Sequence, residues 1–323
     1  MRTTTLGSTG PTVGVIGLGC MGMSFAYDMA AARDDDASVA VIRKAFDLGA
    51  SLIDTADAYG PYTNEELVGR ALAGGYRERA VLATKVGVVT PAESFHRAGQ
   101  LPVDGSPEHV RASIDGSLRR LGVDHVDLYQ LHRVDPEVPL EDTWGAMAEV
   151  VSAGKARAIG LSQVSVEEIR QAEAIHPVAS VQSEMSLWTR DYLTDVLPYC
   201  EQQGIAFLPF SPLGNGFLTG RFTSVEELPD QDARRSRPRF QRDALQANLA
   251  IVDAVKAVAA RLGASPAQVA LAWLVAQGRY VVPIPGTKTS KYLADNVAAA
   301  DVVLGEADLA ELNALPAPIG DVR

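Results

Sequence analysis

The sequence IDTADAYG spans residues 53–60 and places an aspartate at the end of a short apolar run, with a tyrosine five residues after it. Two later segments are built in the same way. The sequence VLATK at 81–85 ends on a lysine, and VDLYQLH at 126–132 ends on a histidine. In a parallel α/β sheet the carboxyl ends of the strands converge at one edge, where ligands bind. The pattern therefore predicts one cleft that holds Asp54, Tyr59, Lys85 and His132.

Apolar, strand-like segments alternate with segments of helical period from about residue 13 to about residue 300. Ser106-Pro107 and Ser265-Pro266 are typical helix starts, with an N-cap serine and a proline at the first helical position. Eight expected strands that alternate with helices indicate a (β/α)8 barrel. We therefore expect an α/β fold, a TIM barrel formed as one domain by residues 1–323. The expected strands span about residues 13–18, 50–54, 80–85, 126–131, 157–161, 179–182, 205–209 and 281–285.

Two regions fall outside this alternation. Residues 2–12 carry turn signals at Gly7 and at Gly10-Pro11, and we expect them to form a hairpin under the barrel floor. Residues 212–247 are too long for a simple loop after the seventh strand and are rich in arginine. A loop of this length near a barrel mouth is either functional or solvated. Two interpretations stay open, a lid that covers a cofactor and a surface excursion.

A dinucleotide-binding fingerprint is present in form at residues 17–22, which read GLGCMG. In a doubly wound fold, an acidic residue should end the second strand about 20 residues further on. The aspartates at 34–36 lie in a polar stretch before a helix, and the second strand ends only at Asp54. The spacing therefore disfavours that fold, and glycines in the first loop of a barrel account for the motif equally well.

Composition excludes some classes of partner. The 323 residues carry a formal charge of −11, which argues against nucleic acid and anionic membranes. Cys20 and Cys200 belong to no CxxC pair, and no Cys/His cluster has zinc spacing, so we expect no metal and two reduced thiols. The N-terminus lacks the apolar core of a signal peptide, and no apolar run approaches 18 residues. We expect a cytoplasmic protein.

Each residue of the predicted cleft also has an ordinary structural interpretation, as a cap, an ion pair or a packed side chain. Together the four solve one chemical problem. A tyrosine is a weak acid, with an ordinary pKa near ~10, and a nearby lysine ammonium should lower that value. Asp54 would hold Lys85 charged, and a neutral His132 would orient a substrate oxygen. The four residues together could protonate a carbonyl oxygen from Tyr59. The hydride that reduces the carbonyl carbon must come from a cofactor.

The residues resemble the aldo-keto reductases over nearly the whole chain. The stretch HRVDP at 132–136 and the Arg239-Phe240 region are most similar to the pyridoxal-reductase-like branch of microbes and plants. The motifs that carry the family resemblance lie at residues 17–24, 53–60, 118–124, 154–162, 210–214 and 284–288.

The resemblance implies a catalytic tetrad of Asp54, Tyr59, Lys85 and His132, with Tyr59 as the general acid. It also implies NADPH bound in extended form, with its nicotinamide amide held by Ser162 and Gln182. Phe210 to Gly214 should line the pyrophosphate, and the segment after Pro285 should take the adenosine phosphate. The cofactor-binding residues implied in this way are Gly19, Met21, Gly22, Asp54, Ser162, Gln163, Gln182, Phe210, Ser211, Pro212, Leu213, Gly214, Pro285, Gly286, Thr287, Lys288, Lys291, Asp295 and Asn296.

The sequence departs from the family pattern at two places. Gln163 stands where the family usually has asparagine, or in this branch often an acid. Thr289 and Ser290 stand where the branch often has further basic residues. The 2′-phosphate would then lie on Lys288, on Lys291 or on an arginine of residues 212–247.

The resemblance also places a substrate pocket at the barrel mouth. Its mostly apolar walls fit an aryl or medium-chain aldehyde or ketone. Arg133 would either attract an anionic substrate or pair with Asp135 or Glu137, and the short tail after Leu312 would leave the site open. The expected pocket residues, besides Tyr59 and His132, are Met23, Phe25, Val88, Arg133 and Trp188.

Two other classes of function stay open. A nucleotide-sensing regulatory subunit of the potassium-channel β-subunit type shares this fold and much of the tetrad. A non-reductive barrel lyase or isomerase would bind no nicotinamide cofactor. The sequence indicates a small-molecule carbonyl substrate as the partner and does not indicate an oligomeric state.

Overall fold

The computed structural model describes residues 1–24, 33–89 and 102–321. Seven parallel strands form one sheet in which each strand lies beside its neighbour in sequence. Their C-terminal ends all point to the same side, as the sequence pattern predicts. The strands are β3 (Leu18–Gly19), β4 (Leu52–Asp54), β5 (Val81–Val86), β6 (Val126–Leu131), β7 (Ala156–Ser162), β8 (Ser180–Glu184) and β9 (Ala206–Phe210).

Residues 280–286 close the barrel between β9 and β3. The N–H groups of Val282 and Ile284 donate to carbonyls of β9, and the carbonyls of Pro283 and Pro285 accept from glycines at β3 and just before it. A proline has no N–H, so the side of this segment that faces β3 accepts hydrogen bonds but donates none. The eighth strand expected at 281–285 is therefore in place as bridges rather than as a regular strand, and the architecture is a (β/α)8 barrel.

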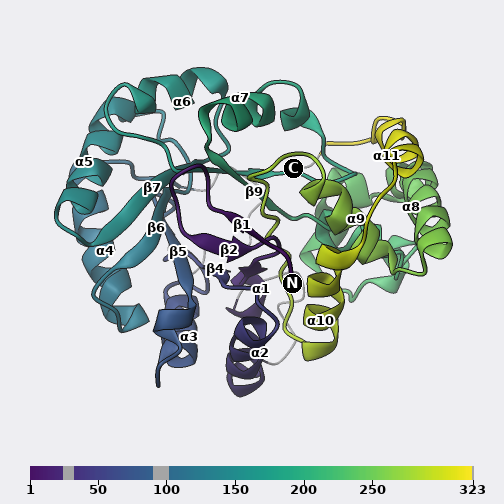
Figure 1. Ribbon diagram of the computed structural model, residues 1–323, viewed down its shortest axis with the longest axis horizontal. Helices are drawn as coiled ribbons and strands as arrows, with labels where there is room; N and C mark the ends of the chain where they lie inside the picture. The colour runs from purple at the N-terminus through teal and green to yellow at the C-terminus, as the bar shows by residue number, and fades with distance from the viewer. Residues whose placement is uncertain (25–32, 90–101, 322–323) are drawn as a thin grey trace.

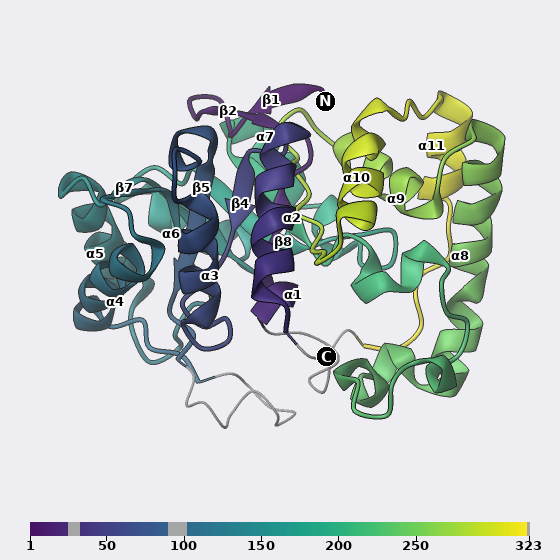
Figure 2. The same cartoon turned by 90° about the horizontal axis from the view of Figure 1, so that it is seen from below.

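An antiparallel hairpin of β1 (Thr3–Thr5) and β2 (Thr12–Gly14) covers one end of the barrel. Leu6 and Val13 are buried there against the lower layer of the barrel interior, and Figures 1 and 2 show the hairpin across that opening. The predicted hairpin is confirmed. The first expected strand, 13–18, is wrong in its bounds, because its start pairs with the N-terminal strand and only Leu18–Gly19 joins the barrel.

Helices surround the sheet, and α8 and α11 lie outside α9 (Figure 1). Ser106 and Ser265 accept hydrogen bonds as N-caps, and Pro107 and Pro266 open their helices, as predicted. The helices are α1 (Met21–Ser24), α2 (Asp35–Asp47), α3 (Thr63–Leu72), α4 (Pro107–Leu121), α5 (Leu140–Ser152), α6 (Val166–Glu173), α7 (Val196–Gln203), α8 (Arg242–Leu262), α9 (Pro266–Val275), α10 (Ser290–Ala298) and α11 (Glu306–Asn313).

Alternation along each strand determines what faces the barrel interior. On β5, Val81 and Ala83 belong to the inner apolar cluster, and Leu82 belongs to the outer one, against the helices. Side chains of a strand alternate between its two faces, so Lys85 follows Val81 and Ala83 inward. The lower barrel is therefore filled by apolar side chains, and polar ones occupy its upper end.

The region 212–247 folds into four short 3-10 turns before α8 begins. Several of its arginines hold this region together. Arg234 pairs with Asp232 at 2.7 Å, and Arg235 donates to the carbonyls of Val225 and Leu228. These contacts within residues 212–247 give the region a defined structure.

Within the described ranges, no single helix is long and apolar enough to cross a membrane, although α8 and α9 together, bent by 92°, pass by length and composition. In the same ranges no group of three or more His, Cys, Asp or Glu side chains is placed to hold a metal ion.

Candidate functional site

The predicted tetrad comes together at the upper end of the barrel. Lys85 Nζ lies 2.6 Å from Asp54 Oδ1 and 3.2 Å from Tyr59 Oη, and it donates a third hydrogen bond to the carbonyl of Thr55 at 2.8 Å. Lys85 is completely buried, and Asp54 and Tyr59 nearly so. The ammonium thus has three oxygen partners in a site largely shielded from water.

The balance of burial and charge keeps Lys85 protonated. Burial alone lowers the pKa of an ammonium, but the Asp54 carboxylate and the Tyr59 hydroxyl outweigh it, and the pKa of Lys85 is raised. A buried cation is stable when its donors and its charge are both matched, as they are here.

Tyr59 departs from the expectation. Burial is the largest influence and raises the pKa of the phenol; Lys85 opposes it, and the net direction is upward. The expectation that Lys85 brings this pKa below its ordinary value is wrong, because burial outweighs the ammonium. The phenol is therefore fully protonated at neutral pH. Lys85 stabilises the phenolate as it forms, without creating it in the resting state.

His132 follows β6 and lies edge-on to the Tyr59 ring, with the ring centroids 5.7 Å apart at 83°. Its backbone N–H donates to the carbonyl of Val86 at 2.8 Å, which fixes its place. Burial first, then Lys85 and Arg133, hold the pKa of His132 well below its ordinary value. The imidazole is therefore neutral and suited to hydrogen bonding to a substrate oxygen.

Two buried amides complete the surroundings of Asp54. Gln182 Nε2 donates to Asp54 Oδ2 at 2.8 Å, and Gln130 Nε2 donates to the same oxygen at 3.3 Å. Gln182 was predicted as a cofactor contact; Gln130 was not singled out. Its signal is the alternation Leu128-Gln130-His132, which puts Gln130 on the inner face of β6.

The end of β7 presents a hydroxyl and an amide. Arg133 donates to Ser162 Oγ at 3.2 Å and to the carbonyl of His132. Gln163 has a left-handed backbone with φ of 59°, and Tyr192 donates to its Oε1 at 3.2 Å. Gln163 Nε2 is buried and has no partner among the described residues. A free buried donor at a strand end is suited to a ligand carbonyl.

Asp135 is one of the two acids that the sequence offers as a partner for Arg133, the alternative being an anionic substrate. The carboxylate of Asp135 accepts the backbone N–H groups of Gly105 and Glu137, each at 2.9 Å. The guanidinium of Arg133 lies against the end of β7, beside Ser162.

The predicted pyrophosphate segment, Phe210 to Gly214, leaves the end of β9 in a tight turn. Ser211, Gly214 and Asn215 have left-handed backbones with φ of 47°, 56° and 55°. The change from the negative φ of Leu213, −104°, to the left-handed Gly214 is of the kind that groups backbone N–H donors and suits an anion.

The adenosine end of the predicted site lies around the start of α10. Lys288 and Lys291 are exposed there. Arg221, which the sequence reasoning did not single out among the loop arginines, stacks its guanidinium over Tyr292, 4.8 Å from the ring centroid, and Lys291 Nζ lies 5.9 Å from the same centroid. Three basic side chains are thus available at this helix start.

Asp295 has structural contacts instead of free oxygens. Its two carboxylate oxygens accept hydrogen bonds from Ser265 and Gln268, each at 2.9 Å, so it ties α10 to the start of α9. Asn296 is buried one residue further on. The other predicted residues of this segment, Pro285, Gly286 and Thr287, lead from the closing strand into α10.

The first loop of the barrel carries the predicted Gly19, Met21 and Gly22. A Cβ atom at Gly19 would lie 2.8 Å from the carbonyl oxygen of Ile284, so a glycine is needed where the closing segment meets β3. Cys20 beside it is a free, buried thiol whose pKa is raised by burial and then by Asp54. This thiol is unreactive.

The predicted substrate residues are brought together only in part. Met23 and Val88 are buried at the upper end of the barrel, and Phe25 lies outside the described residues. Trp188 is also buried and stacks on Phe217 at 4.1 Å between centroids, with Phe240 edge-on at 5.3 Å. Trp188 therefore anchors the 212–247 region to the loop after β8.

The C-terminal segment reaches further than its length suggested. Residues 314–321 run back along α8 to the end of the molecule opposite the hairpin (Figure 2). Arg239 donates to the carbonyls of Gly320 and Trp188, and Asn248 exchanges two hydrogen bonds with Ile319, each of 2.9 Å. The tail is thus tied to the 212–247 region and to α8.

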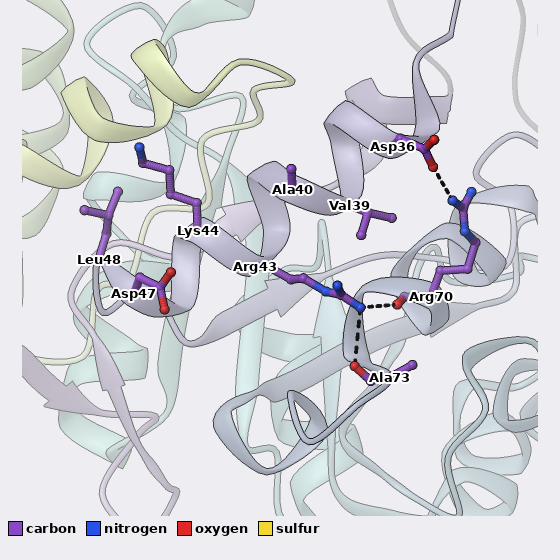
Figure 3. Close-up of a pocket in the computed structure, with 9 residues that line it drawn as sticks. All are labelled: Asp36, Val39, Ala40, Arg43, Lys44, Asp47, Leu48, Arg70 and Ala73. Atoms are coloured by element: carbon purple, nitrogen blue, oxygen red, sulfur yellow. Dashed lines mark hydrogen bonds and ion pairs between the residues drawn. The ribbon is translucent and has the colours of Figure 1, made fainter.

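A surface hollow of about 950 Å³ lies between α2 and α3, on the outside of the barrel (Figure 3). Its arginines are already used: Arg43 donates to the carbonyls of Arg70 and Ala73, and Arg70 pairs with Asp36. This hollow holds none of the predicted site residues.

Comparison with known proteins identifies the family of this chain. The model of the Aldo/keto reductase family matches residues 15–317. The probable aldo-keto reductase 1 of Glycine max is 44% identical over 317 residues, which cover 98% of this chain and 89% of that protein.

Two solved structures share the fold. The glycerol dehydrogenase of Gluconobacter oxydans has a TM-score of 0.86 at 29% identity, covering 96% of this chain and 94% of its own. An aldo/keto reductase of Klebsiella pneumoniae, solved with NADP and acetate, has a TM-score of 0.74 at 28% identity, covering 99% and 97%. The chain belongs to the aldo/keto reductase family, oxidoreductases that act on small carbonyl compounds with nicotinamide cofactors.

Proposed function

We propose that this protein reduces an aldehyde or ketone to an alcohol with NADPH, and that Tyr59 supplies the proton. The observation that carries the proposal is the position of Lys85, whose ammonium is bound to Asp54 at 2.6 Å and lies 3.2 Å from the Tyr59 hydroxyl. A phenol that is protonated at rest and has a cation beside it is ready to give up its proton at a carbonyl oxygen.

Each residue has a separate task in this proposal. The bound nicotinamide would supply the hydride that reaches the carbonyl carbon. Tyr59 Oη donates its proton to the carbonyl oxygen, and Lys85 stabilises the phenolate left behind. His132, neutral because burial holds its pKa low, orients that oxygen without competing for the charge. Asp54 holds the lysine in place, since it is bound on both of its oxygens.

The residues present fit a nicotinamide cofactor. The unpartnered Nε2 of Gln163 and the hydroxyl of Ser162, at the end of β7, suit the oxygen of a carboxamide. The left-handed turn from Ser211 to Asn215 suits a pyrophosphate. Lys288, Lys291 and Arg221 would hold the 2′-phosphate at the start of α10, which supports a preference for NADPH over NADH.

The substrate class rests on the resemblance to the pyridoxal-reductase-like branch. Pyridoxal is an aromatic aldehyde, and the buried Met23 and Val88 provide apolar contacts at the barrel mouth. Arg133 beside Ser162 adds a positive charge to one wall. We therefore propose aromatic aldehydes as the first substrates to test, with pyridoxal among them.

The test replaces Tyr59 by phenylalanine. We expect turnover of the best aldehyde to fall by at least about 100-fold, because general acid catalysis contributes that much. NADPH binding, followed by quenching of tryptophan fluorescence, should stay within about twofold, because the ring and its packing remain. Retained turnover would contradict the role of Tyr59. Absence of NADPH binding by the unaltered protein would contradict the whole proposal.

Tyr62→Phe is the matched control. Tyr62 is a half-exposed phenol three residues further along the same loop. Its loss should leave turnover unchanged. Titrations with NADH alongside NADPH measure the cofactor preference, and equal affinities would contradict a working phosphate site at α10.

A further inference from the structure

The hydrogen bonds of the tetrad continue across the barrel into a closed ring with two glutamines. Gln182 Nε2 donates to Asp54 Oδ2 at 2.8 Å and to Gln130 Oε1 at 3.3 Å. Gln130 Nε2 in turn donates to Asp54 Oδ2 at 3.3 Å. All three side chains are at most 3% exposed, so no solvent competes for these bonds.

This ring determines which way the Gln182 amide points. An amide offers two N–H donors on one side and a carbonyl oxygen on the other, and its orientation follows from the bonds it makes. A carboxylate can only accept, so the Gln182 nitrogen must face Asp54. Its second N–H is used by Gln130 Oε1. What Gln182 offers elsewhere is therefore its carbonyl oxygen, an acceptor.

Gly160 leaves space in the barrel for Ser180 and Gln130. Gly160 on β7 is in register with Gln130 on one side and with Ser180 on the other. A Cβ atom at Gly160 would lie 2.3 Å from Ser180 Oγ and 3.3 Å from Gln130 Cγ. Ser180 Oγ donates to Gln130 Oε1 at 3.5 Å. Both the nitrogen and the oxygen of the Gln130 amide are hydrogen-bonded, and Gly160 leaves space beside it, so the side chain is held in one defined position.

We propose that Gln130 is a positioning residue that fixes the amide of Gln182, so that Gln182 presents its carbonyl oxygen to the N–H group of a nicotinamide carboxamide. The inference rests on the proposed cofactor. It gives Gln130 a role in selecting the carboxamide, through Gln182 and without touching the cofactor itself.

The chemical consequence is a preference for a ligand that can donate. A carboxamide has an N–H group, whereas the acetyl group of 3-acetylpyridine adenine dinucleotide phosphate has a methyl in its place. With its orientation fixed, Gln182 accepts a hydrogen bond from the first ligand and meets an apolar group in the second. Without Gln130, the second N–H of Gln182 loses its acceptor and Asp54 alone holds the amide. The amide can then tilt, so that its carbonyl oxygen is less well aimed at the carboxamide N–H and the preference for the carboxamide over the acetyl group weakens.

The experiment titrates the full-length protein with NADP⁺ and with the acetylpyridine analogue and compares the two dissociation constants. We expect the unaltered protein to bind NADP⁺ about tenfold more tightly, the size of one buried hydrogen bond. In Gln130→Met, which keeps the volume and removes the polar atoms, that ratio should fall below about threefold. The ratio of the two dissociation constants is unaffected by a change that weakens both ligands equally, such as a smaller fraction of folded protein.

Tyr129→Phe is the control on the same strand. Tyr129 is buried, faces the outer helices and donates to the carbonyl of Val110 at 3.4 Å. Its loss should lower the thermal midpoint and leave the ratio unchanged, as a purely structural change would. Gln130→Leu provides a second variant with the same expected ratio if Gln130→Met does not fold.

The outcomes separate this inference from the proposed function. A Gln130 variant that keeps the tenfold ratio overturns the role of Gln130, while binding of NADP⁺ leaves the proposed function standing. An unaltered protein with equal affinity for the two ligands overturns the presented carbonyl. An unaltered protein that binds neither ligand removes the proposed function and this inference together.

Discussion

Asp54 and Asp57 stand three residues apart in the sequence, and both are at most 4% exposed, yet their surroundings differ completely. Asp54 faces the barrel interior, where the Lys85 ammonium binds one oxygen and glutamine amides bind the other. Asp57 lies toward Glu65 of α3, and its Oδ1 has no partner among the described residues. Burial, then the Glu65 carboxylate, raises the pKa of Asp57 to about 8.

The comparison shows that burial alone does not decide the state of a carboxyl group. Partners do. Asp54 is held in an ion pair that the proposed chemistry uses, whereas Asp57 is a neutral acid for most of the physiological range. Arg120 is the cation with the larger effect on the pKa of Asp57, and it is bound to Glu65 at 2.7 Å. Three substitutions test this difference, from the largest expected effect to the smallest.

Lys85→Met removes the cation from the Asp54 side. It leaves a buried carboxylate without its charge partner, and we expect the free energy of unfolding to fall by about 3–5 kcal/mol. Turnover should be lost as well, because nothing then stabilises the phenolate. Urea unfolding at neutral pH measures the first effect.

Lys155→Met is the control for the same change at the surface. Lys155 pairs with Asp115, and both side chains are more than a third exposed. Such a pair contributes at most about 1 kcal/mol. Equal losses of stability in the two variants would contradict the ion-pair account of Asp54.

The sequence predicts the surroundings of Asp54 better than those of Asp57. Asp54, Lys85 and His132 follow from strand ends and alternation, which act over a few residues and so are visible in the chain. Gln130 obeys the same alternation, but its partner is Gln182 on β8, and the space for it depends on Gly160. Such cross-barrel contacts have no local signature.

The same limit applies to the closing strand and to Tyr59. Prolines at 283 and 285 conceal a strand in which only every second N–H is needed, so its place was predictable and its irregularity was not. The direction of the Tyr59 pKa depends on whether burial outweighs Lys85, which only the three-dimensional surroundings decide. The burial of Asp57 beside Glu65 belongs to this group too.

Asp57→Asn tests whether Asp57 is a neutral acid, through the pH dependence of the free energy of unfolding. The folded pKa of about 8 lies above the ordinary value of 3.8, so the folded protein binds more protons than the unfolded chain between these values. Stability is therefore lost as pH rises through this window, by roughly 1.4 kcal/mol per pH unit. Asparagine does not titrate, so the variant should gain about 3 kcal/mol relative to the unaltered protein between pH 5 and pH 7.

Asp127→Asn is the matched control, because Asp127 is equally buried but paired with Arg77 at 2.9 Å and bonded to the N–H of Leu82. Its replacement breaks this ion pair and should lower the free energy of unfolding at pH 7. Denaturant unfolding at pH 5 and pH 7 gives both comparisons, and a difference that does not change with pH in Asp57→Asn would contradict the neutral acid.

The smallest effect concerns Glu65, the carboxylate that acts on Asp57. Thr84, the outward neighbour of Lys85 on β5, donates its hydroxyl to Glu65 Oε1 at 2.6 Å, and both side chains are fully buried. Thr84→Val removes a hydrogen bond to a charged group, which contributes about 2 kcal/mol.

Thr143→Val removes a hydroxyl bonded at the same 2.6 Å to the neutral carbonyl of Gly105, and about 1 kcal/mol is expected there. Thermal unfolding measures both. Because Thr84 points away from the barrel, turnover should survive in Thr84→Val even as stability falls. That outcome would separate the contacts that support the fold from those that support the chemistry, whereas equal losses in the two variants would contradict a stronger hydrogen bond to Glu65.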